Sequence, residues 1–298
     1  MSEPTAAFRA GYIAIVGRPN VGKSTLLNCL VGQKLSITSR KPQTTRQRIT
    51  GILTRADAQL MFVDTPGFQT RHTSTLNRHM NRTVTQALAD VDVILLVIEA
   101  GRFSPEDRAV LALLPAKRRA LLVINKTDRL ADRGLLLPFI TQVAAAHEFA
   151  EIVPVSAAKS HGVEELATTI TRYLPAQPAL YGADEVTESS ERFLAAELIR
   201  EKLFRLLGDE LPYASAVIID KFALEGRLRR IHASIIVDKD THKGIVVGAK
   251  GAQLKAIGTK ARLDMEKLFG GKVHLELWVK VKHGWAENRQ VMKQLGYG

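Results

Sequence analysis

Residues 17–24 read GRPNVGKS, between an apolar run, YIAIV, that predicts a strand and a stretch, VGKSTLLNCLVG, that predicts a helix. Glycines in this context allow a tight turn whose backbone amides point at phosphate oxygens from the positive end of the helix. Lys23 offers a cation to the β- and γ-phosphates, and the Ser24 hydroxyl is a ligand for Mg²⁺. The segment is therefore predicted to bind nucleotide phosphates through Gly17, Asn20, Gly22, Lys23, Ser24 and Thr25.

The stretch DTPG at 64–67 places a carboxylate at the end of the apolar run QLMFV. Asp64 is predicted to hold Mg²⁺ through water, because carboxylates and water are the ligands this ion prefers. The amide of Gly67 is predicted to meet a γ-phosphate. Thr-Pro-Gly is also favourable turn chemistry, so a plain surface turn is the alternative for this stretch.

Two further stretches are predicted to select the base: NKTD at 125–128, which ends the run ALLVIN, and SAAK at 156–159, which follows EIVPV. The carboxylate of Asp128 can accept from the N1–H and the exocyclic amine of guanine, a donor pair that adenine lacks. The first two residues of NKTD are predicted to bridge neighbouring loops, and a backbone amide of SAAK to reach guanine O6. The predicted base-binding residues are Asn125, Lys126, Asp128, Ser156 and Ala157.

These four motifs resemble the GTPase signature of the translation-factor-related class, and the loop SRKPQTTRQR at 39–48 resembles the first switch of the Era family. The resemblance implies GTP and GDP as ligands and hydrolysis of GTP to GDP and phosphate. It aligns Thr45 with the switch threonine that reaches Mg²⁺ and the γ-phosphate, with Thr44 as the adjacent alternative. The predicted metal ligands are Ser24, Thr45 and Asp64.

Phe68 follows Gly67 directly, where many GTPases carry a glutamine that orients the attacking water. A phenyl ring cannot hydrogen-bond water, so we expect Phe68 to pack the switch, and Gln69 is a weaker catalytic candidate. In related GTPases an asparagine at the position of Asn20 helps to bind a potassium ion. We therefore predict slow hydrolysis stimulated by K⁺, with a role in shaping the turn as the alternative for this side chain. The predicted catalytic residues are Asn20, Lys23, Thr45 and Gly67.

A second constellation, GAKG at 248–251, precedes the predicted helix AQLKAIGTKARLDMEKLF. Glycines that open a helix let the backbone approach a nucleic-acid strand, and a lysine between them adds a cation for a phosphate. KH domains clamp about four single-stranded nucleotides with such a GxxG loop. The segment order around the loop (helix, two strands, two helices, strand) suits the type II arrangement. The predicted RNA-binding residues are Gly248, Ala249, Lys250, Gly251 and Lys255.

The C-terminal sequence HLELWVKVKHGWAENRQVMKQLGYG also resembles the Era family, so the resemblance covers nearly the whole chain. It implies binding to the 3′ end of 16S rRNA and a role in maturation of the 30S ribosomal subunit. Trp278 alternates with lysines in a predicted strand, and we expect it to pack in the core. Trp285 lies beyond that strand and is predicted to be exposed, with a docking role as the alternative.

The nucleotide motifs must be positioned by the short apolar runs that precede them, which alternate with amphipathic stretches from residue 11 to about residue 175. Near-continuous, β-branched runs are typical of strands buried on both faces by helices. The pattern predicts an α/β fold with a doubly wound, mostly parallel P-loop sheet, followed by a smaller α+β type II KH domain. The predicted boundaries are a G domain at 1–175, a linker at 176–190 and a KH domain at 191–298.

The net charge of the 298 residues is +12, and it is unevenly distributed. Residues 221–298 contain 16 basic and 7 acidic side chains, an excess of 9, which favours a polyanionic partner and nucleic acid before a membrane surface. No signal sequence or membrane-spanning run is recognisable, so the protein is expected in the cytoplasm. We also expect it to be a monomer. Two alternatives stay open at this point: a constitutive RNA-binding chaperone with a structural nucleotide, and a GTPase bound peripherally to the inner face of the cell membrane.

Overall fold

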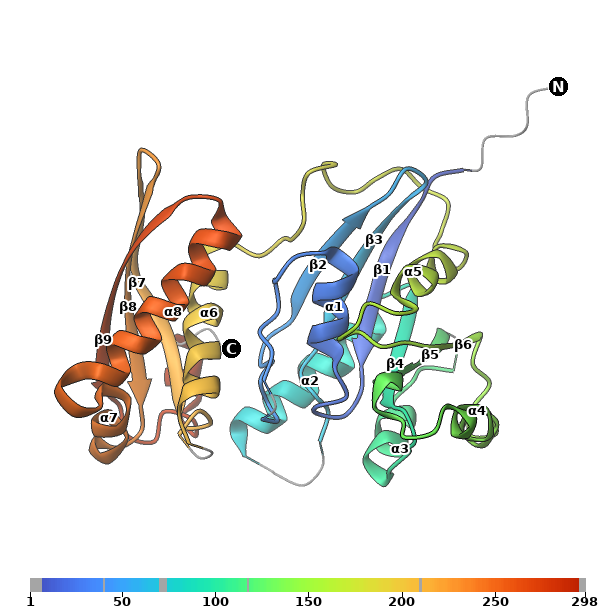
Figure 1. Cartoon of the computed structure of the whole chain (residues 1–298), viewed down its shortest axis with the longest axis horizontal. Coiled ribbons are helices and arrows are strands. Elements are labelled where there is room, and N and C mark those ends of the chain that lie inside the picture. Colours follow the sequence, from blue (N-terminus) through green and yellow to red (C-terminus); the bar gives the residue numbers. More distant parts are fainter. Residues whose placement is uncertain (1–6, 40, 70–73, 117, 209–210, 295–298) are drawn as a thin grey trace. The chain divides into compact units, whose positions relative to one another are not determined.

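The computed structural model consists of two compact units (Figure 1). Residue 40 of the predicted first switch and residues 295–298, at the end of the predicted KH domain, lie outside the described residues. The first unit comprises residues 1–36, 45–72 and 80–188, and the second comprises residues 37–44, 73–79 and 189–298. The residues described are 7–39, 41–69, 74–116, 118–208 and 211–294, with the backbone alone for Arg289 and Gln294.

The first unit is built on a six-stranded sheet in the order β2-β3-β1-β4-β5-β6. Neighbouring strands run parallel except β2, which pairs antiparallel with β3, so the predicted doubly wound, mostly parallel sheet is confirmed. The bounds are β1 (Arg9–Val16), β2 (Ile49–Thr54), β3 (Ala58–Asp64), β4 (Val93–Glu99), β5 (Arg119–Asn125) and β6 (Glu151–Pro154).

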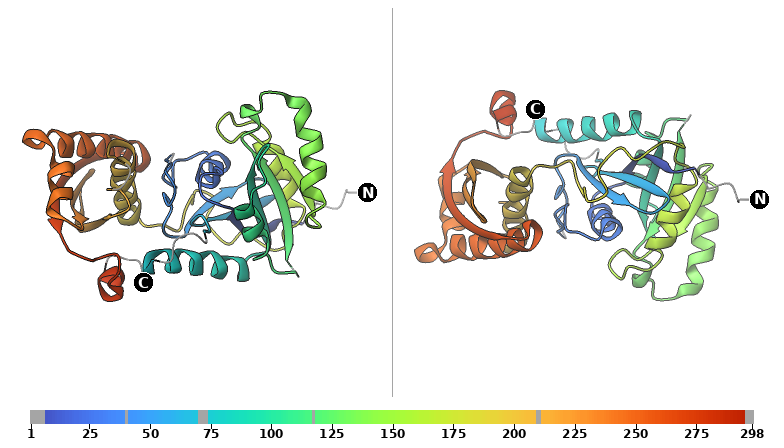
Figure 2. Two further views of the ribbon diagram at one scale, coloured as in Figure 1. Left: turned by 90° about the horizontal axis from the view of Figure 1, so that it is seen from below. Right: turned by 90° about the horizontal axis from the view of Figure 1, so that it is seen from above.

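Helices cover both faces of this sheet, which explains why its central strands are apolar without alternation (Figure 2). Helices α1 (Lys23–Val31) and α5 (Val163–Thr171) pack together on one face. Side chains of α2 (Thr75–Ala89), α3 (Pro105–Leu111) and α4 (Leu136–Ala144) join one hydrophobic cluster on the other face. Two 3₁₀ turns, η1 (Thr127–Arg129) and η2 (Arg133–Leu135), follow β5.

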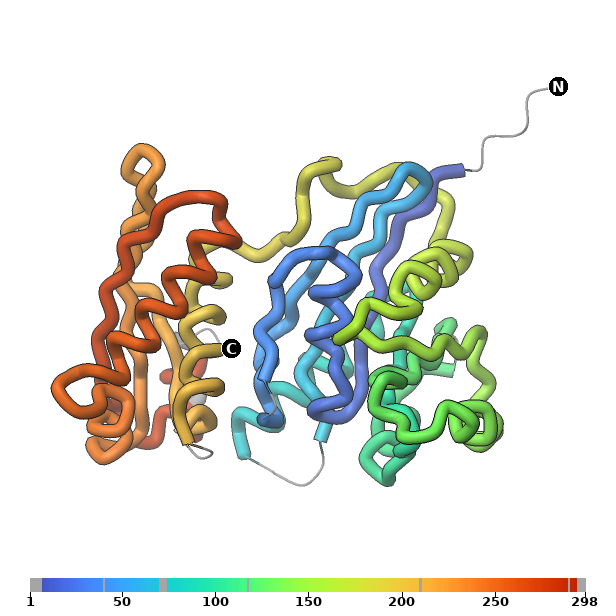
Figure 3. The backbone as a smooth tube through the Cα atoms, viewed as in Figure 1, coloured from blue at the N-terminus to red at the C-terminus, as the bar shows by residue number. Residues whose placement is uncertain are grey.

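The segment predicted as a linker begins as an ordered part of the first unit. After α5 the chain runs extended beside β1, β2 and β3 (Figure 3). The side-chain carbonyl of Gln59 accepts from the amides of Leu180 and Tyr181, and the Thr187 hydroxyl donates to the carbonyl of Thr50. These contacts hold residues up to Thr187 against the sheet.

The second unit carries a three-stranded sheet of β7 (Ser215–Glu225), β8 (Leu228–Val237) and β9 (Lys272–Val281). Strand β7 pairs antiparallel with β8, and β8 pairs parallel with β9. Helices α6 (Glu191–Leu206) and α8 (Ala252–Phe269) bury a shared apolar cluster against one sheet face, and α7 (Asp240–Val247) and α9 (Arg289–Gln294) complete the described helices. The chain order α6-β7-β8-α7-α8-β9 is the predicted type II KH arrangement.

The two tryptophans are placed opposite to expectation. Trp278 lies on β9, with 44% of its surface exposed, and contacts the ring of His232 edge-on. Alternate residues of a strand point to opposite faces of the sheet, and Trp278 lies on the face that the helices do not cover. Trp285 is completely buried among Ala216, Ile236 and Met292, and its indole N–H donates to the carbonyl of Ala214. Both expectations were therefore wrong.

Replacement of Trp285 by Ala is expected to lower the free energy of unfolding of the second unit by about 3–5 kcal/mol, since it empties a large volume in a closed cluster. Trp278→Ala is the matched control and should cost less than about 1 kcal/mol, because its ring is largely solvated. Urea titration followed by the remaining tryptophan measures both changes. Equal losses for the two variants would contradict the assigned burial.

Candidate functional site

The phosphate loop joins the end of β1 to the first turn of α1, and its geometry requires glycine. Gly22 has a φ of 101°, and a Cβ there would lie 2.3 Å from Nδ2 of Asn125. A side chain at Gly67 would meet Pro19 at 2.8 Å, so DTPG lies directly against the loop. The Lys23 ammonium turns back into this loop and donates to the carbonyls of Gly17 and Arg18, at 3.0 Å each.

Lys23 is electrostatically prepared for a phosphate. Desolvation by burial lowers its pKa from 10.5 to about 8, although the carboxylate of Asp64 acts in the opposite direction. A polyphosphate placed beside the ammonium would favour its charged form and raise this pKa again. Thr25, the last residue of the predicted loop set, is half-buried in the first turn of α1.

Three hydroxyls converge on the buried carboxylate of Asp64 at the end of β3. Its Oδ2 accepts from Ser24 and Ser36 at 2.7 Å each and from Thr45 at 3.4 Å, while the Ser24 and Thr45 oxygens lie 2.8 Å apart. The other oxygen, Oδ1, is buried without a hydrogen-bond partner among the described residues. Burial raises the pKa of this carboxyl group. An unpartnered carboxylate oxygen amid hydroxyl oxygens fits a hard cation such as Mg²⁺.

This cluster distinguishes Thr45 from Thr44 and adds a residue that the sequence did not indicate. Thr45, and not Thr44, lies beside Ser24, since the Thr44 hydroxyl donates instead to the carbonyl of Lys41. Ser36 belongs to the cluster although the sequence analysis missed it. It stands in no motif and reaches Asp64 only because the chain after α1 folds back.

The base end of the site is held together by Asn125 from the end of β5. Its Nδ2 donates to the carbonyl of Val21 in the phosphate loop, and its Oδ1 accepts from the amide of Ala157, which is the predicted bridging of loops. The Ser156 hydroxyl donates to Oδ1 of Asp128 at 2.5 Å. The motifs NKTD and SAAK are therefore brought together, with Asp128 fixed by a neighbour in SAAK.

Lys126 is anchored by a charged network that the motifs do not contain. It has a φ of 64°, and its ammonium lies 3.0 Å from the carboxylate of Glu99. Glu99 also pairs with Arg18, which binds the buried Asp107. Ion pairs to Lys126 and Arg18 lower the pKa of Glu99 against the effect of its partial burial. The network fixes the aliphatic stem of Lys126 beside the base end of the site.

Phe68, directly after the DTPG segment, packs against other side chains as expected. Its ring packs, partly buried, against the cluster beneath α2, α3 and α4. The backbone amide and carbonyl of Gln69 exchange hydrogen bonds with the side chain of Asn81. Asn20 has an exposed side chain and a φ of 65°, which asparagine tolerates better than most residues.

The GAKG motif forms a separate site in the second unit, as a tight turn between α7 and α8. Gly248, Lys250 and Gly251 all have positive φ values, of 69°, 49° and 80°. Ala249, Lys250 and Lys255 are exposed, so the turn presents open backbone and two cations at the start of α8. The apolar side chain of Ile245 on α7 is 53% exposed, a neighbour that the sequence analysis missed because it belongs to an ordinary helical pattern.

No helix in the described part of the chain combines the length and apolarity that crossing a bilayer requires.

Two family models match the chain, one over each part that carries a candidate site. Residues 12–126 match the family model described as a 50S ribosome-binding GTPase, and residues 210–286 match that of a KH domain. GTPase Era of Nitrosomonas eutropha is 57% identical over 292 residues, covering 98% of this chain and 99% of the relative. GTPase Era of Chromobacterium violaceum is 53% identical over 289 residues, covering 97% and 98%.

Two solved structures are similar over almost the whole chain. One is a variant of Era from Aquifex aeolicus bound to GDP·AlF₄⁻, with a TM-score of 0.94, 39% identity, and coverage of 98% of this chain and 100% of that chain. The other is Era in complex with MgGDPNP and nucleotides 1506–1542 of 16S ribosomal RNA, with a TM-score of 0.94, 39% identity, and coverage of 98% and 99%.

Replacement of Asp128 by Asn is expected to move nucleotide preference from guanine to xanthine. The amide Nδ2 would face the guanine amine donor to donor, whereas xanthine offers a carbonyl oxygen there. Loss of a charge-assisted hydrogen bond of about 1.5–3 kcal/mol should weaken GTP binding at least tenfold.

The change is measured by how well GTP and xanthosine triphosphate displace a fluorescent nucleotide from the site. Asp132→Asn is the matched control, because Asp132 is exposed in the same loop and its carboxylate accepts only a local amide. Unchanged GTP affinity in the Asp128 variant would contradict the role assigned to that carboxylate.

Proposed function

Because this chain belongs to the GTPase Era family and is a GTPase, we propose that it binds GTP with Mg²⁺ and uses GTP hydrolysis to control its hold on 16S rRNA during maturation of the 30S subunit. One observation carries the proposal: the buried Asp64, with one unpartnered oxygen, faces hydroxyls from the phosphate loop and the first switch. We place the G domain at 1–175, the linker at 176–190 and the KH domain at 191–298. The protein acts as a monomer.

Each residue of the nucleotide site has a distinct task in this proposal. Lys23 and the loop amides hold the β- and γ-phosphates, and Ser24, Thr45 and Asp64 hold Mg²⁺ directly or through water. When bound, the ion neutralises charge that develops on the phosphate oxygens. Thr45 links the γ-phosphate to the first switch, and Gly67 links it to the DTPG segment at 64–67. Loss of the γ-phosphate removes both contacts, which releases the switch segments.

Attack of water on the γ-phosphate proceeds here without a glutamine at position 68. The phenyl ring of Phe68 is packed away into the sheet cluster, where it cannot orient a water molecule. Phosphoryl transfer depends mainly on positioning and on electrostatic stabilisation, so a monovalent cation can take the place of a missing donor. Asn20, an exposed residue of the phosphate loop, is our candidate ligand for K⁺ through its side-chain oxygen.

GTP hydrolysis is accordingly expected to be several-fold faster in KCl than in NaCl at equal ionic strength. The side chain is best removed by Asn20→Gly, because glycine keeps the positive φ without strain. This variant should lose the preference for K⁺, while Asn20→Asp, which keeps a ligand oxygen, should retain it. Equal rates of the wild type in KCl and NaCl would dismiss the potassium site.

The RNA-binding part of the proposal is supported by the turn at residues 248–251. KH domains clamp single-stranded RNA with this type of loop, and the exposed Lys250 and Lys255 supply cations at its helix end. Era in the related complex binds nucleotides 1506–1542 of 16S rRNA. We propose the corresponding 3′ segment as the RNA ligand of this chain.

Gly251→Asp is expected to abolish binding of an RNA with the sequence of nucleotides 1506–1542, since it places a negative charge where a phosphate must approach. A Cβ at Gly251 meets no atom within 4 Å, and aspartate tolerates a positive φ, so folding is preserved. Gly270→Asp at the other end of α8 is the matched control, with the same open space and a φ of 64°. Fluorescence anisotropy of labelled RNA measures the affinity.

RNA binding by the Gly251 variant at wild-type affinity would overturn the KH assignment. The same measurement with GDPNP and with GDP separates the proposal from a constitutive RNA chaperone. A chaperone of that kind would bind RNA equally in both nucleotide states.

A further inference from the structure

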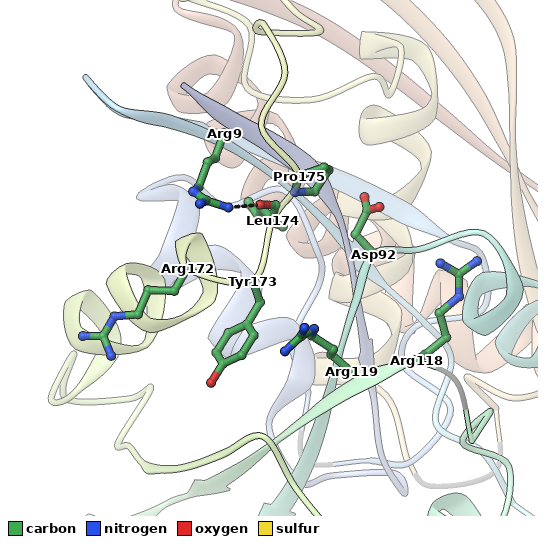
Figure 4. Close-up of a pocket in the computed structure, with 8 residues that line it drawn as sticks. All are labelled: Arg9, Asp92, Arg118, Arg119, Arg172, Tyr173, Leu174 and Pro175. Atoms are coloured by element: carbon green, nitrogen blue, oxygen red, sulfur yellow. Dashed lines mark hydrogen bonds between the residues drawn. The ribbon is translucent and has the colours of Figure 1, made fainter. Parts of the chain in front are cut away.

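A polar cavity of about 440 Å³ lies in the first unit at the end of the sheet opposite the nucleotide motifs (Figure 4). The residues that line it lie at the amino ends of β1, β4 and β5. The nucleotide motifs follow the carboxyl ends of β1, β3, β5 and β6. Arg119 at this end of β5 and Asn125 at the other are six positions apart along the strand, which corresponds to about 20 Å. The cavity is therefore no part of the GTP site. Its lining residues are Arg9, Asp92, Arg118, Arg119, Arg172, Tyr173, Leu174 and Pro175.

Four arginines and one aspartate give this cavity a formal charge of +3. Among the described residues, none of the four guanidinium groups forms an ion pair with a carboxylate. Arg18, Arg200 and Arg229, by contrast, each pair with an acidic side chain. The one carboxylate of the lining, Asp92, already accepts from the amide of Tyr12 at 2.9 Å, which ties it to the backbone. The cavity keeps an excess of positive charge that the fold does not neutralise.

The fold holds three of the arginines in defined positions. Arg9 donates to the carbonyl of Leu174 (Figure 4). Arg118 donates to the carbonyl of Ala89 at 2.9 Å. The guanidinium of Arg119 lies over the ring of Tyr173, 5.5 Å from its centroid, and Arg172 extends outward from the end of α5. The Tyr173 hydroxyl is directed to Glu151, so its ring is fixed as a support for Arg119. Arg118 and Arg119 are nevertheless exposed and accessible to a ligand.

We infer that this cavity binds the phosphodiester backbone of RNA, as a second contact on the RNA that the proposed function assigns to the chain. Guanidinium groups match phosphate oxygens by paired hydrogen bonds, and a row of them contacts successive phosphates. The charge excess of residues 1–180, 22 basic against 14 acidic side chains, indicates a polyanion. An anionic membrane is less suited, because the apolar lining consists of the buried Leu174 and of Pro175, while the ring of Tyr173 is covered by Arg119 and its hydroxyl bonds to Glu151.

The double variant Arg118→Gln/Arg119→Gln tests the inference in the full-length protein. Its affinity for complete 16S rRNA should fall about tenfold near physiological salt. The slope of log K against log salt concentration should decrease by about 0.7–0.9 for each phosphate that the variant no longer binds. Arg118→Lys/Arg119→Lys should keep the slope. The matched control is Arg82→Gln/Arg102→Gln, which removes two exposed arginines of the same unit outside the cavity and should change neither quantity.

The short RNA of nucleotides 1506–1542 separates this inference from the proposed function. The arginine variant should bind the short RNA like the wild type, whereas Gly251→Asp should not bind it. Wild-type protein that binds neither RNA would refute the proposed function itself. If the wild type binds 16S rRNA and the arginine variant binds it with the same affinity and the same slope, only the inference about the cavity is refuted.

Two readouts secure the interpretation of the arginine variant. Its melting temperature and GTPase rate should equal those of the wild type, because the cavity lies away from the residues that hold GTP. Vesicles with anionic lipid should bind the wild type and the variant equally. Loss of vesicle binding with unchanged 16S rRNA binding would overturn the inference in favour of a membrane contact.

Discussion

The buried carboxylate of Asp64 is the constraint around which the functional end of the first unit is organised. It has no exposed surface, and three hydroxyls from separate segments donate to one of its oxygens. A buried charge is costly unless it is paired or bound to a cation, and the second oxygen has no partner among the described residues. The phosphate loop, the loop after α1 and the first switch therefore meet at a place whose oxygen atoms fit a hard metal ion.

The direction of the parallel strands explains why one sheet can carry two chemically different ends. The four nucleotide motifs follow the carboxyl ends of β1, β3, β5 and β6, where backbone amides and loop side chains converge. The amino ends of β1, β4 and β5 instead gather arginines and one aspartate. The length of the strands separates the two ends of the sheet, so a ligand at one end does not compete with GTP at the other.

Much of the fold and of the nucleotide site could be predicted because both are encoded locally. Near-continuous apolar runs mark strands covered on both faces, and each motif stands directly after such a run, so the carboxyl-end rule brings the motifs together. The exposure of Trp278 and Trp285 could not be predicted in this way. Alternation tells which residues share a face, but the cover on that face comes from distant segments. Ser36 and the arginine cavity were missed for the same reason, since tertiary contacts alone assemble them.

Lys23 and Asp64 together determine which ligand the nucleotide site accepts. Burial lowers the pKa of the ammonium and raises the pKa of the carboxyl group, so the fold weakens both charges at once. A cation alone would favour the charged carboxylate but repel the ammonium, and a bare polyphosphate would favour the ammonium but repel the carboxylate. A magnesium–nucleotide complex brings a charge of the right sign to each group. The electrostatics of the two residues therefore favour the complex over either component.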